Sequence, residues 1–379
     1  MLWDVAIIGG GPAGSASAIS LRQTFPALSV LIVESSDYSD QRVGEVLPPV
    51  ARPLLQHLGV LSSLCAEFGI PAHGLACAWG QTQLQETDYF YAANGGGWHL
   101  ERNRFDALLA IHAELAGADV WRKTSMRSAT RTGDVWQLQL SGGRDAQARW
   151  VIDATGRNAT FARMQGAARQ AKDSLTAFSR IYSDSDKAEI RTVVEGCPHG
   201  WWYTSPLPDG KRVVSFLTDA DIGRNLGVSE PSRWEKQLDR SVHVSFLAAN
   251  RFSLQRMIVR SAASVALDCV HADGWLATGD AAAAFDPLSA QGITNALRSG
   301  ILASYAVGDA LCSNDELAPA RYAAILRVQG ESYERSHRKH YAMERRWSEY
   351  PFWARRQRRE AIPLTMPSVE YSAALQGAP

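Results

Sequence analysis

The chain has 379 residues, with 39 basic and 39 acidic side chains and a formal net charge of +0. Hydrophobic residues make up 46% and charged residues 21%, which is typical of a globular protein and excludes a disordered or collagen-like chain. The charge balance lacks the basic excess of nucleic-acid binders. With no basic leader and no apolar run of the ~18 residues that a membrane span needs, we expect a cytoplasmic protein that binds neither nucleic acid nor membrane. Five scattered cysteines without a C-x-x-C pair predict neither disulfides nor a metal site.

A βαβ unit is predicted at the start of the chain. Residues 3–8 (WDVAII) and 28–33 (LSVLIV) are strand-like, and residues 15–22 between them favour a helix. The turn has G-x-G-x-x-G spacing, and the motif comprises Gly9, Gly11, Pro12, Ala13 and Gly14. Its glycines permit, in order, a tight turn, close approach of a pyrophosphate and close packing of helix on strand. Because Glu34 ends the second strand, where a carboxylate binds ribose hydroxyls, the unit predicts a dinucleotide site.

Further elements follow in chain order. A helix is expected over residues 50–58, and Asn103 is expected to cap a helix from Arg104 to Leu115. Alternating apolar residues over 175–217 predict antiparallel strands, and residues 319–359 are mostly helix-like.

Two strand–turn elements favour FAD over NAD. Residues 154–156 (ATG) follow the strand-like RWVID, and they resemble the A-T-G element of FAD-binding proteins. Residues 279–280 (GD) follow GWLAT, and they resemble the element whose aspartate holds the flavin ribityl chain. Residues 286–293 precede a helix, where backbone amides and the helix dipole suit a flavin ring. The cofactor residues predicted from these segments are Gly156, Gly279, Asp280, Pro287, Gln291, Gly292 and Ile293.

Over roughly residues 1–310 the chain resembles group-A flavoprotein monooxygenases of the p-hydroxybenzoate-hydroxylase fold. Residues 100–106 (LERNRFD) match the R-x-x-F-D helix start, and residues 44–49 (GEVLPP) are similar to the G-E-x-x-P segment of the tryptophan-halogenase-like branch. That branch contains halogenases and also flavoproteins that mature tryptophylquinone enzymes by oxygenating a tryptophan in a partner protein. Residues 344–353 look like the tail of these maturation flavoproteins. The resemblance adds Arg42 and Arg102 to the cofactor residues.

The resemblance implies an α/β fold with an FAD-binding Rossmann-like domain, of the glutathione-reductase and p-hydroxybenzoate-hydroxylase type. An antiparallel β-sheet substrate domain is interleaved with it, and a helical C-terminal segment follows. The expected boundaries are 1–74, 99–174 and 262–318 for the FAD domain, 75–98 and 175–261 for the substrate domain, and 319–379 for the C-terminal segment.

The function expected from the resemblance is FAD-dependent hydroxylation of an aromatic ring, a tryptophan side chain of a precursor polypeptide. Halogenation is disfavoured, because halogenases need a lysine after G-E-x-x-P and this chain has none before Lys123. Ser289 stands where halogenases carry a glutamate, and residues 201–206 match their W-x-W-x-I-P motif only loosely. Two alternatives remain: a flavin reductase of geranylgeranyl-reductase type, and a non-catalytic FAD-fold binding protein. The electron donor is either NAD(P)H or externally reduced flavin, with a flavin reductase as partner in the second case.

Glu45 is the candidate catalytic base or electrostatic tuner, with a structural carboxylate as an equal alternative. The candidate substrate residues are Trp79, Trp98, His199, Trp201 and Tyr203, and core filling is the default interpretation of the tryptophans. The basic tail, residues 333–359, suggests docking of the partner polypeptide through Arg345, Arg346, Arg355 and Arg356. A solvated helix face is the alternative.

Overall fold

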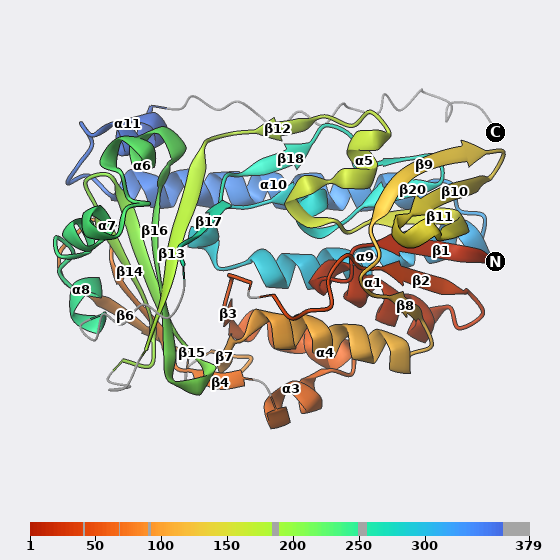
Figure 1. The fold of residues 1–379 in the computed structure, drawn as a ribbon, viewed down its shortest axis with the longest axis horizontal. Helices are drawn as coiled ribbons and strands as arrows, with labels where there is room; N and C mark the ends of the chain where they lie inside the picture. Colours follow the sequence, from red (N-terminus) through yellow and green to blue (C-terminus); the bar gives the residue numbers. More distant parts are fainter. Residues whose placement is uncertain (41, 68, 90–91, 184–188, 249–255, 359–379) are drawn as a thin grey trace, which may run out of the picture.

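A twisted parallel sheet is built from the N-terminal βαβ unit and three later strands (Figure 1). The computed structural model describes residues 1–40, 42–67, 69–89, 92–183, 189–248 and 256–358. The parallel strands, in spatial order, are β20 (Trp275–Ala277), β11 (Asp145–Asp153), β1 (Leu2–Ile8), β2 (Val30–Val33) and β8 (Asp119–Trp121). The edge strand β19 (His271–Ala272) and the hairpin of β9 (Met126–Thr132) and β10 (Val135–Leu140) are antiparallel additions. Buried apolar runs in β1 and β2 fit strands that are covered on both faces.

Helix α1 (Pro12–Thr24) packs between α4 (Arg102–Leu115) and α9 (Gly292–Cys312). Small residues allow the close approach, since a Cβ on Gly300 would lie 2.4 Å from the Ala13 carbonyl oxygen. The predicted start of α4 is wrong, because the helix begins at Arg102 and its N-cap is Glu101 instead of Asn103. Arg102 forms an ion pair with Asp106, four residues later, and this contact stabilises Arg102 as part of the first turn of the helix.

A seven-stranded sheet, antiparallel except for one pair, stands beside the parallel sheet. Its order is β17 (Ile258–Ser261), β13 (Leu175–Ser183), β16 (Lys211–Asp219), β15 (Gly200–Leu207), β14 (Thr192–Cys197), β5 (Gly74–Ala78) and β6 (Gln85–Asp88). On one face Trp202 packs with Trp234 of α7 (Pro231–Leu238) and with Val244 of α8 (Val244–Leu247). Alternation along the strands directs Trp201 and Tyr203 to the other face, called the inner face below.

Helix α10 (Ala318–Met343) is the long blue helix that runs from the parallel sheet to the seven-stranded sheet (Figure 1). At one end Tyr322 Oη donates to the Ala277 carbonyl of β20, and near the other end Tyr341 contacts Trp201 of β15. Helix α11 (Pro351–Gln357) packs against α10 and completes the cover over part of the inner face.

The other α-helices and strands are short and surround the two large sheets. They are β3 (Val46–Leu47), β4 (Gly69–Ala72), β7 (Gly97–Leu100), β12 (Arg169–Ala171), β18 (Val265–Leu267), β21 (Ala283–Ala284), α2 (Arg52–His57), α3 (Leu61–Glu67), α5 (Thr160–Met164) and α6 (Ala220–Leu226). The predicted α/β fold class is confirmed. Within the described ranges, no helix combines the length and apolar character that crossing a membrane requires.

Candidate active site

A cavity of about 640 Å³ lies where the parallel sheet meets the inner face of the seven-stranded sheet. Fourteen of the residues predicted from sequence line it: Gly9, Gly11, Pro12, Ala13, Glu34, Arg42, Glu45, Arg102, Gly156, Tyr203, Asp280, Pro287, Gly292 and Ile293. Three predicted cofactor residues, Gly14, Gly279 and Gln291, are next to lining residues but do not line the cavity themselves. The fold thus brings together segments that lie far apart in the sequence.

The glycine turn after β1 forms one end of this cavity. Gly9 has φ +108°, and a Cβ there would lie 2.3 Å from the Ala154 carbonyl oxygen. A Cβ on Gly14 would lie 1.9 Å from the Gly9 carbonyl oxygen, so the first and third glycines serve the turn and the packing of α1, as predicted. Gly11 differs, because no atom lies within 4 Å of its would-be Cβ. Its open side faces the cavity at the N-terminus of α1.

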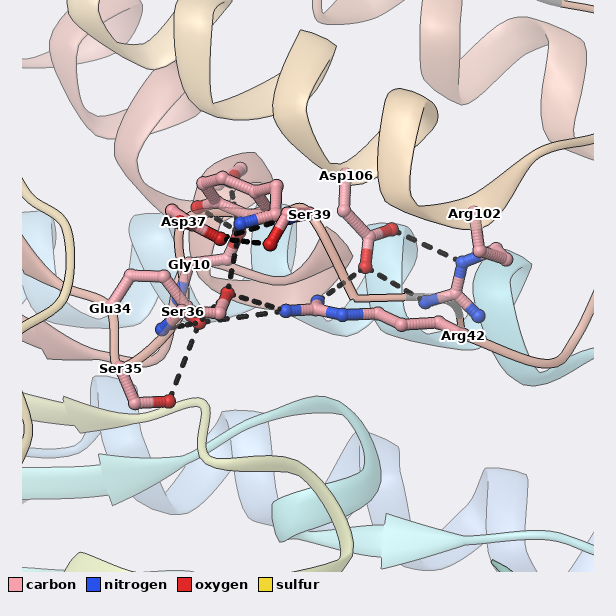
Figure 2. Close-up of polar contacts among 11 residues, drawn as sticks. Gly10, Glu34, Ser35, Ser36, Asp37, Ser39, Arg42, Arg102 and Asp106 are labelled. Atoms are coloured by element: carbon pink, nitrogen blue, oxygen red, sulfur yellow. Dashed lines mark hydrogen bonds and ion pairs between the residues drawn. The ribbon is translucent and has the colours of Figure 1, made fainter. Parts of the chain in front are cut away.

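Two arginines and two carboxylates form a network of hydrogen bonds and ion pairs along the neighbouring wall of the cavity (Figure 2). The Asp106 carboxylate lies between Arg42 and Arg102, accepting from Arg42 Nη1 at 2.7 Å and from Arg102 Nε at 3.1 Å. Arg42 also lies 3.6 Å from Glu34, whose other oxygen accepts the Gly10 N–H at 2.7 Å. The arginines are therefore held on the cavity wall by buried carboxylates.

The start of α9 forms a second helix N-terminus at the cavity. A Cβ on Gly292 would meet no atom within 4 Å, and the N-cap residue Gln291 makes no side-chain capping bond. The first-turn N–H groups of α9 are therefore available to an acceptor in the cavity. Asp280 lies beside this helix, 3.5 Å from Arg157, and burial raises the pKa of its carboxyl group.

The other end of the cavity, called the chamber below, is floored by the inner face of the seven-stranded sheet. Tyr203, Ser215 and Ser179 form one cross-strand row, and Leu217 and Ala177 belong to the next. The small side chains leave space above the sheet. Tyr203 Oη lies 3.4 Å from Glu45 Oε2.

Both polar groups of this pair are buried, and their pKa values are shifted. Burial raises the pKa of Glu45, although the N–H groups of Gly44 and Glu45 and the charge of Arg102 oppose the shift. Burial and the neighbouring Glu45 raise the pKa of Tyr203 well above its usual value. A carboxyl group of raised pKa at the end of a cavity is suited to exchange protons with a ligand.

A family comparison agrees with this arrangement. Residues 3–305 match the model of the FAD-binding domain family. The chain belongs to the FAD-binding domain family. It is an FAD-dependent oxidoreductase, and the predicted fold, which flavin-dependent halogenases share, is confirmed.

Two curated relatives cover nearly the whole chain. LodB of Marinomonas mediterranea, named as an FAD-dependent oxidoreductase, is 29% identical over 93% of this chain and 96% of its own. A digeranylgeranylglycerophospholipid reductase of Methanosphaerula palustris is 28% identical over 89% of this chain and 85% of its own.

Solved structures share the fold. The myxobacterial chondrochloren halogenase CndH superposes with a TM-score of 0.85 at 19% identity, over 94% of this chain and 86% of its own. The peptidyl tryptophan dihydroxylase QhpG superposes with a TM-score of 0.76 at 24% identity, over 94% of this chain and 79% of its own. At these identities the likeness concerns the fold alone.

The residues of this FAD-binding family member fit the cofactor. The open sides of Gly11 and Gly292 lie on the cavity wall, each at a helix N-terminus that can hold an anionic or acceptor group. Glu34 and Asp280 also line the cavity, and their carboxylates can accept hydrogen bonds from the hydroxyl groups of the cofactor. The binding roles of individual residues remain predictions.

Four of the five predicted substrate residues do not line the cavity. Trp79 and Trp201 are buried with Tyr341 and Trp353 beneath α10 and α11, and their ring nitrogens bond to His340 O at 2.8 Å and Tyr341 Oη at 3.1 Å. The C-terminal helices therefore use these two indoles as core. The other two are also occupied elsewhere: Trp98 is buried against the Arg52 guanidinium, and His199 packs edge-on against Tyr350. Tyr203 alone of the five lines the chamber.

The structure contradicts the docking role predicted for Arg356, and it pairs Arg346 and Arg355 with carboxylates of the fold. Arg356 is buried and bonds to Asp219 at 2.6 Å, while Arg355 bonds to Asp219 and Asp221. Arg346 bonds to the buried Glu344. Of these four arginines only Arg356 is buried, Arg346 is half-buried, and Arg345 and Arg355 are exposed, so docking through the two exposed arginines stays a prediction. The part of this tail beyond residue 358, including Arg359, lies outside the described residues.

Sequence reasoning missed two polar residues that line the cavity, Asp106 and Arg157, and also Tyr38, which bonds to the glycine turn. Asp106 was visible as the last residue of the R-x-x-F-D match, but its link to Arg42 needs the fold. Arg157 directly follows the A-T-G element and bonds to the Phe285 carbonyl at 2.9 Å. Tyr38 donates to the Gly10 carbonyl at 2.9 Å, and no motif marks it.

Proposed function

We propose that this oxidoreductase hydroxylates an aromatic ring, a tryptophan side chain of a precursor polypeptide. The observation that carries the proposal is the chamber. It continues from the predicted FAD site to Glu45, Tyr203 and the small side chains of β13 and β16. Glu45 places a buried carboxyl group of raised pKa in the chamber, and no lysine is among the described residues that line the cavity.

In this proposal the chain's own residues bind, orient and move a proton. When bound and reduced, FAD supplies an activated oxygen atom, so that one atom of O₂ enters the ring and the other leaves as water, with two electrons and two protons from the reductant. The helix N-termini at Gly11 and Gly292 orient the cofactor, and Tyr203 with the two serines positions the ring. The ring carbon that gains oxygen loses a proton, and Glu45 is the acceptor within the chamber.

Three observations disfavour halogenation as the activity. The described lysines lie off the cavity wall, since Lys123 for example pairs with Asp37 on the surface. Ser289, at the position where halogenases carry a glutamate, donates to the Asp286 carbonyl. The halogenase neighbours share the fold at low identity, which leaves the chemistry to the residues of this chain.

A polypeptide substrate is supported by one structural neighbour. QhpG, which has the same fold, is a peptidyl tryptophan dihydroxylase. Arg260 and Ser261 of the edge strand β17 are exposed and also line the cavity. The mouth therefore lies at a sheet edge, where a chain can approach.

The test combines a product assay with a pH profile. Reduced protein, supplied with NAD(P)H or externally reduced flavin, is mixed with O₂ and either tryptophan-containing peptides or free tryptophan. We expect peptides to gain the mass of one or two oxygen atoms. Glu45→Gln should lower turnover by ~10²-fold or more and remove the acid limb of the profile. Halogenated product when halide is added, or faster reaction of free tryptophan, would overturn the proposal.

A reductase of unsaturated lipids is the second candidate, because a lipid reductase aligns at 28% identity. Such a substrate needs a long apolar tunnel. The chamber instead presents the hydroxyl groups of Tyr203, Ser179 and Ser215 and the carboxyl group of Glu45. Reduction of a geranylgeranyl lipid without O₂ uptake would favour this candidate.

A further inference from the structure

Three side chains of α10 converge on one loop of the cofactor cavity. Tyr333, His337 and Tyr341 are spaced by four residues, so they form one stripe along the helix. Their rings are in contact in sequence order, with centroids 5.4 Å and 4.5 Å apart. The stripe faces Asp286, at the start of the segment that leads into α9.

Asp286 is hydrogen-bonded to all three members of the stripe. His337 Nε2 lies 3.1 Å from Asp286 Oδ2, and Tyr341 Oη donates to the same oxygen at 2.7 Å. The Asp286 N–H donates to Tyr333 Oη at 2.9 Å. The stripe therefore holds both the side chain and the backbone of this residue.

The loop held in this way forms part of the cavity wall. Phe285 stacks on Tyr333 with centroids 4.2 Å apart, and Asp286 Oδ1 accepts the Leu288 N–H at 2.9 Å. Phe285, Asp286 and Pro287 line the cavity, and the loop leads to the open N-terminus of α9 at Gly292. A shift of the loop would therefore move the amide groups that face the cofactor.

The charge on Asp286 depends on the same contacts. Its carboxylate is buried, which opposes ionisation, but the bonds from His337, Leu288 N–H and Tyr341 hold its pKa below the usual value. The stripe thus keeps a negative charge in the wall of the cavity. A buried anion influences the free energy of electron uptake by a nearby group.

We propose that Tyr333, His337 and Tyr341 are positioning residues of the flavin site, through which α10 sets the place of the Asp286 loop and thereby the reduction potential of bound FAD. The C-terminal helix is then a working part of the redox centre as well as a cover for the seven-stranded sheet. The proposal goes beyond the hydroxylation reaction and requires only that FAD binds in the cavity.

The chain offers a closely matched control for Tyr341. Trp201 Nε1 donates to Tyr341 Oη at 3.1 Å, and that hydroxyl reaches Asp286. On the opposite face of the sheet, Trp234 Nε1 donates to Tyr182 Oη at 2.7 Å, and that hydroxyl lies 3.4 Å from Glu235. Tyr341→Phe and Tyr182→Phe therefore remove the same buried group from the same kind of chain of bonds.

The measurements are the midpoint potential and the visible circular dichroism of the holoprotein, with thermal unfolding alongside. We expect Tyr341→Phe to change the ratio of reduced to oxidised FAD binding about tenfold, which is a shift of about 30 mV in the midpoint potential of a two-electron couple. We expect Tyr182→Phe to leave the potential and spectrum unchanged. If both variants are less thermally stable but their midpoint potentials are unchanged, the proposal is overturned, and Tyr341 only stabilises the fold.

A second pair of variants covers the case in which Tyr341→Phe fails to fold. His337 is partly exposed, so its replacement is better tolerated. His337→Gln keeps an N–H donor for Asp286 and should retain the wild-type potential, whereas His337→Leu should shift it. Equal potentials in these two variants would also contradict the proposal. Because no aromatic substrate is used, failure here and failure of the hydroxylation proposal are separate results.

Discussion

The two ends of the cavity are built on different principles. At the nucleotide end, glycines and helix N-termini present backbone, and the glycines at 9 and 14 leave no room for a side chain. At the sheet end, the chamber is shaped by side chains on β13, β15 and β16. Backbone recognition is local in sequence, while side-chain recognition depends on what covers the sheet.

Three successive inward positions of β15 show how the elements packed on the sheet determine whether a side chain is buried or lines the chamber. Trp201 is buried under α10 and α11, and Tyr203 opens onto the chamber. Ser205 is buried against His99 of β7, at 2.8 Å. The same strand therefore supplies core, chamber and core again, because elements distant in the sequence cover its two ends.

The largest effect is expected at the nucleotide end. Gly11→Val should abolish retention of FAD while leaving the fold intact, because its side chain would occupy open cavity space instead of clashing with protein atoms. Bound flavin is measured by visible absorbance of the purified protein. Gly96→Val is the control, since Gly96 is equally open but does not line the cavity. If purified Gly11→Val protein still holds stoichiometric FAD, the backbone at Gly11 does not bind the cofactor.

Next comes the covered part of the sheet. Trp201→Ala should lower the free energy of unfolding by about 3–5 kcal/mol, because it removes a fully buried indole and its bond to Tyr341. Chemical denaturation measures the change. A substrate residue would show a small change in stability and a large loss of turnover, which is the pattern that would contradict its assignment to the core.

His99 gives a pH-dependent contribution beside the chamber. Its ring accepts from Ser205 and donates to the Ile190 carbonyl, and burial lowers its pKa from 6.5 to about 4. Because the unfolded chain binds a proton that the native state excludes, this stability is present above pH 6.5 and is lost as the pH falls towards 4. The loss should be about 3 kcal/mol, at about 1.4 kcal/mol per pKa unit.

The check on His99 is the difference between wild type and His99→Gln in denaturation experiments from pH 7 to 4. Glutamine does not titrate, so the variant should lose less stability over this range. Parallel pH curves for the two proteins would mean that the pKa of His99 is the same in the native and unfolded states.

The smallest effect is expected in the chamber itself. Tyr203→Phe removes a hydroxyl 3.4 Å from Glu45, so the free energy of unfolding should change by less than about 1 kcal/mol. Turnover should fall by about tenfold or less, with FAD content unchanged. Steady-state kinetics with a tryptophan peptide measure this. Loss of stability comparable to that of Trp201→Ala would remove the distinction between chamber and core.

Sequence alone was sufficient for the nucleotide end. A φ of +108° at Gly9 and the close approach at Gly14 are requirements of a few consecutive residues, so the motif reports them directly. The same holds for the Glu34 position after β2 and for Gly292 at the start of α9, since strand ends and helix starts are local features.

The sheet end depended on packing between distant segments. Trp201 and Tyr203 are two residues apart and equally aromatic, yet α10 and α11, more than a hundred residues later, bury only the first. Likewise the charges of Arg355 and Arg356 favour a docking surface in the sequence, whereas in the fold both side chains pair with Asp219. Composition and spacing do not encode which partner a side chain meets across the fold, because burial and ion pairing arise from contacts that form only when the chain is folded.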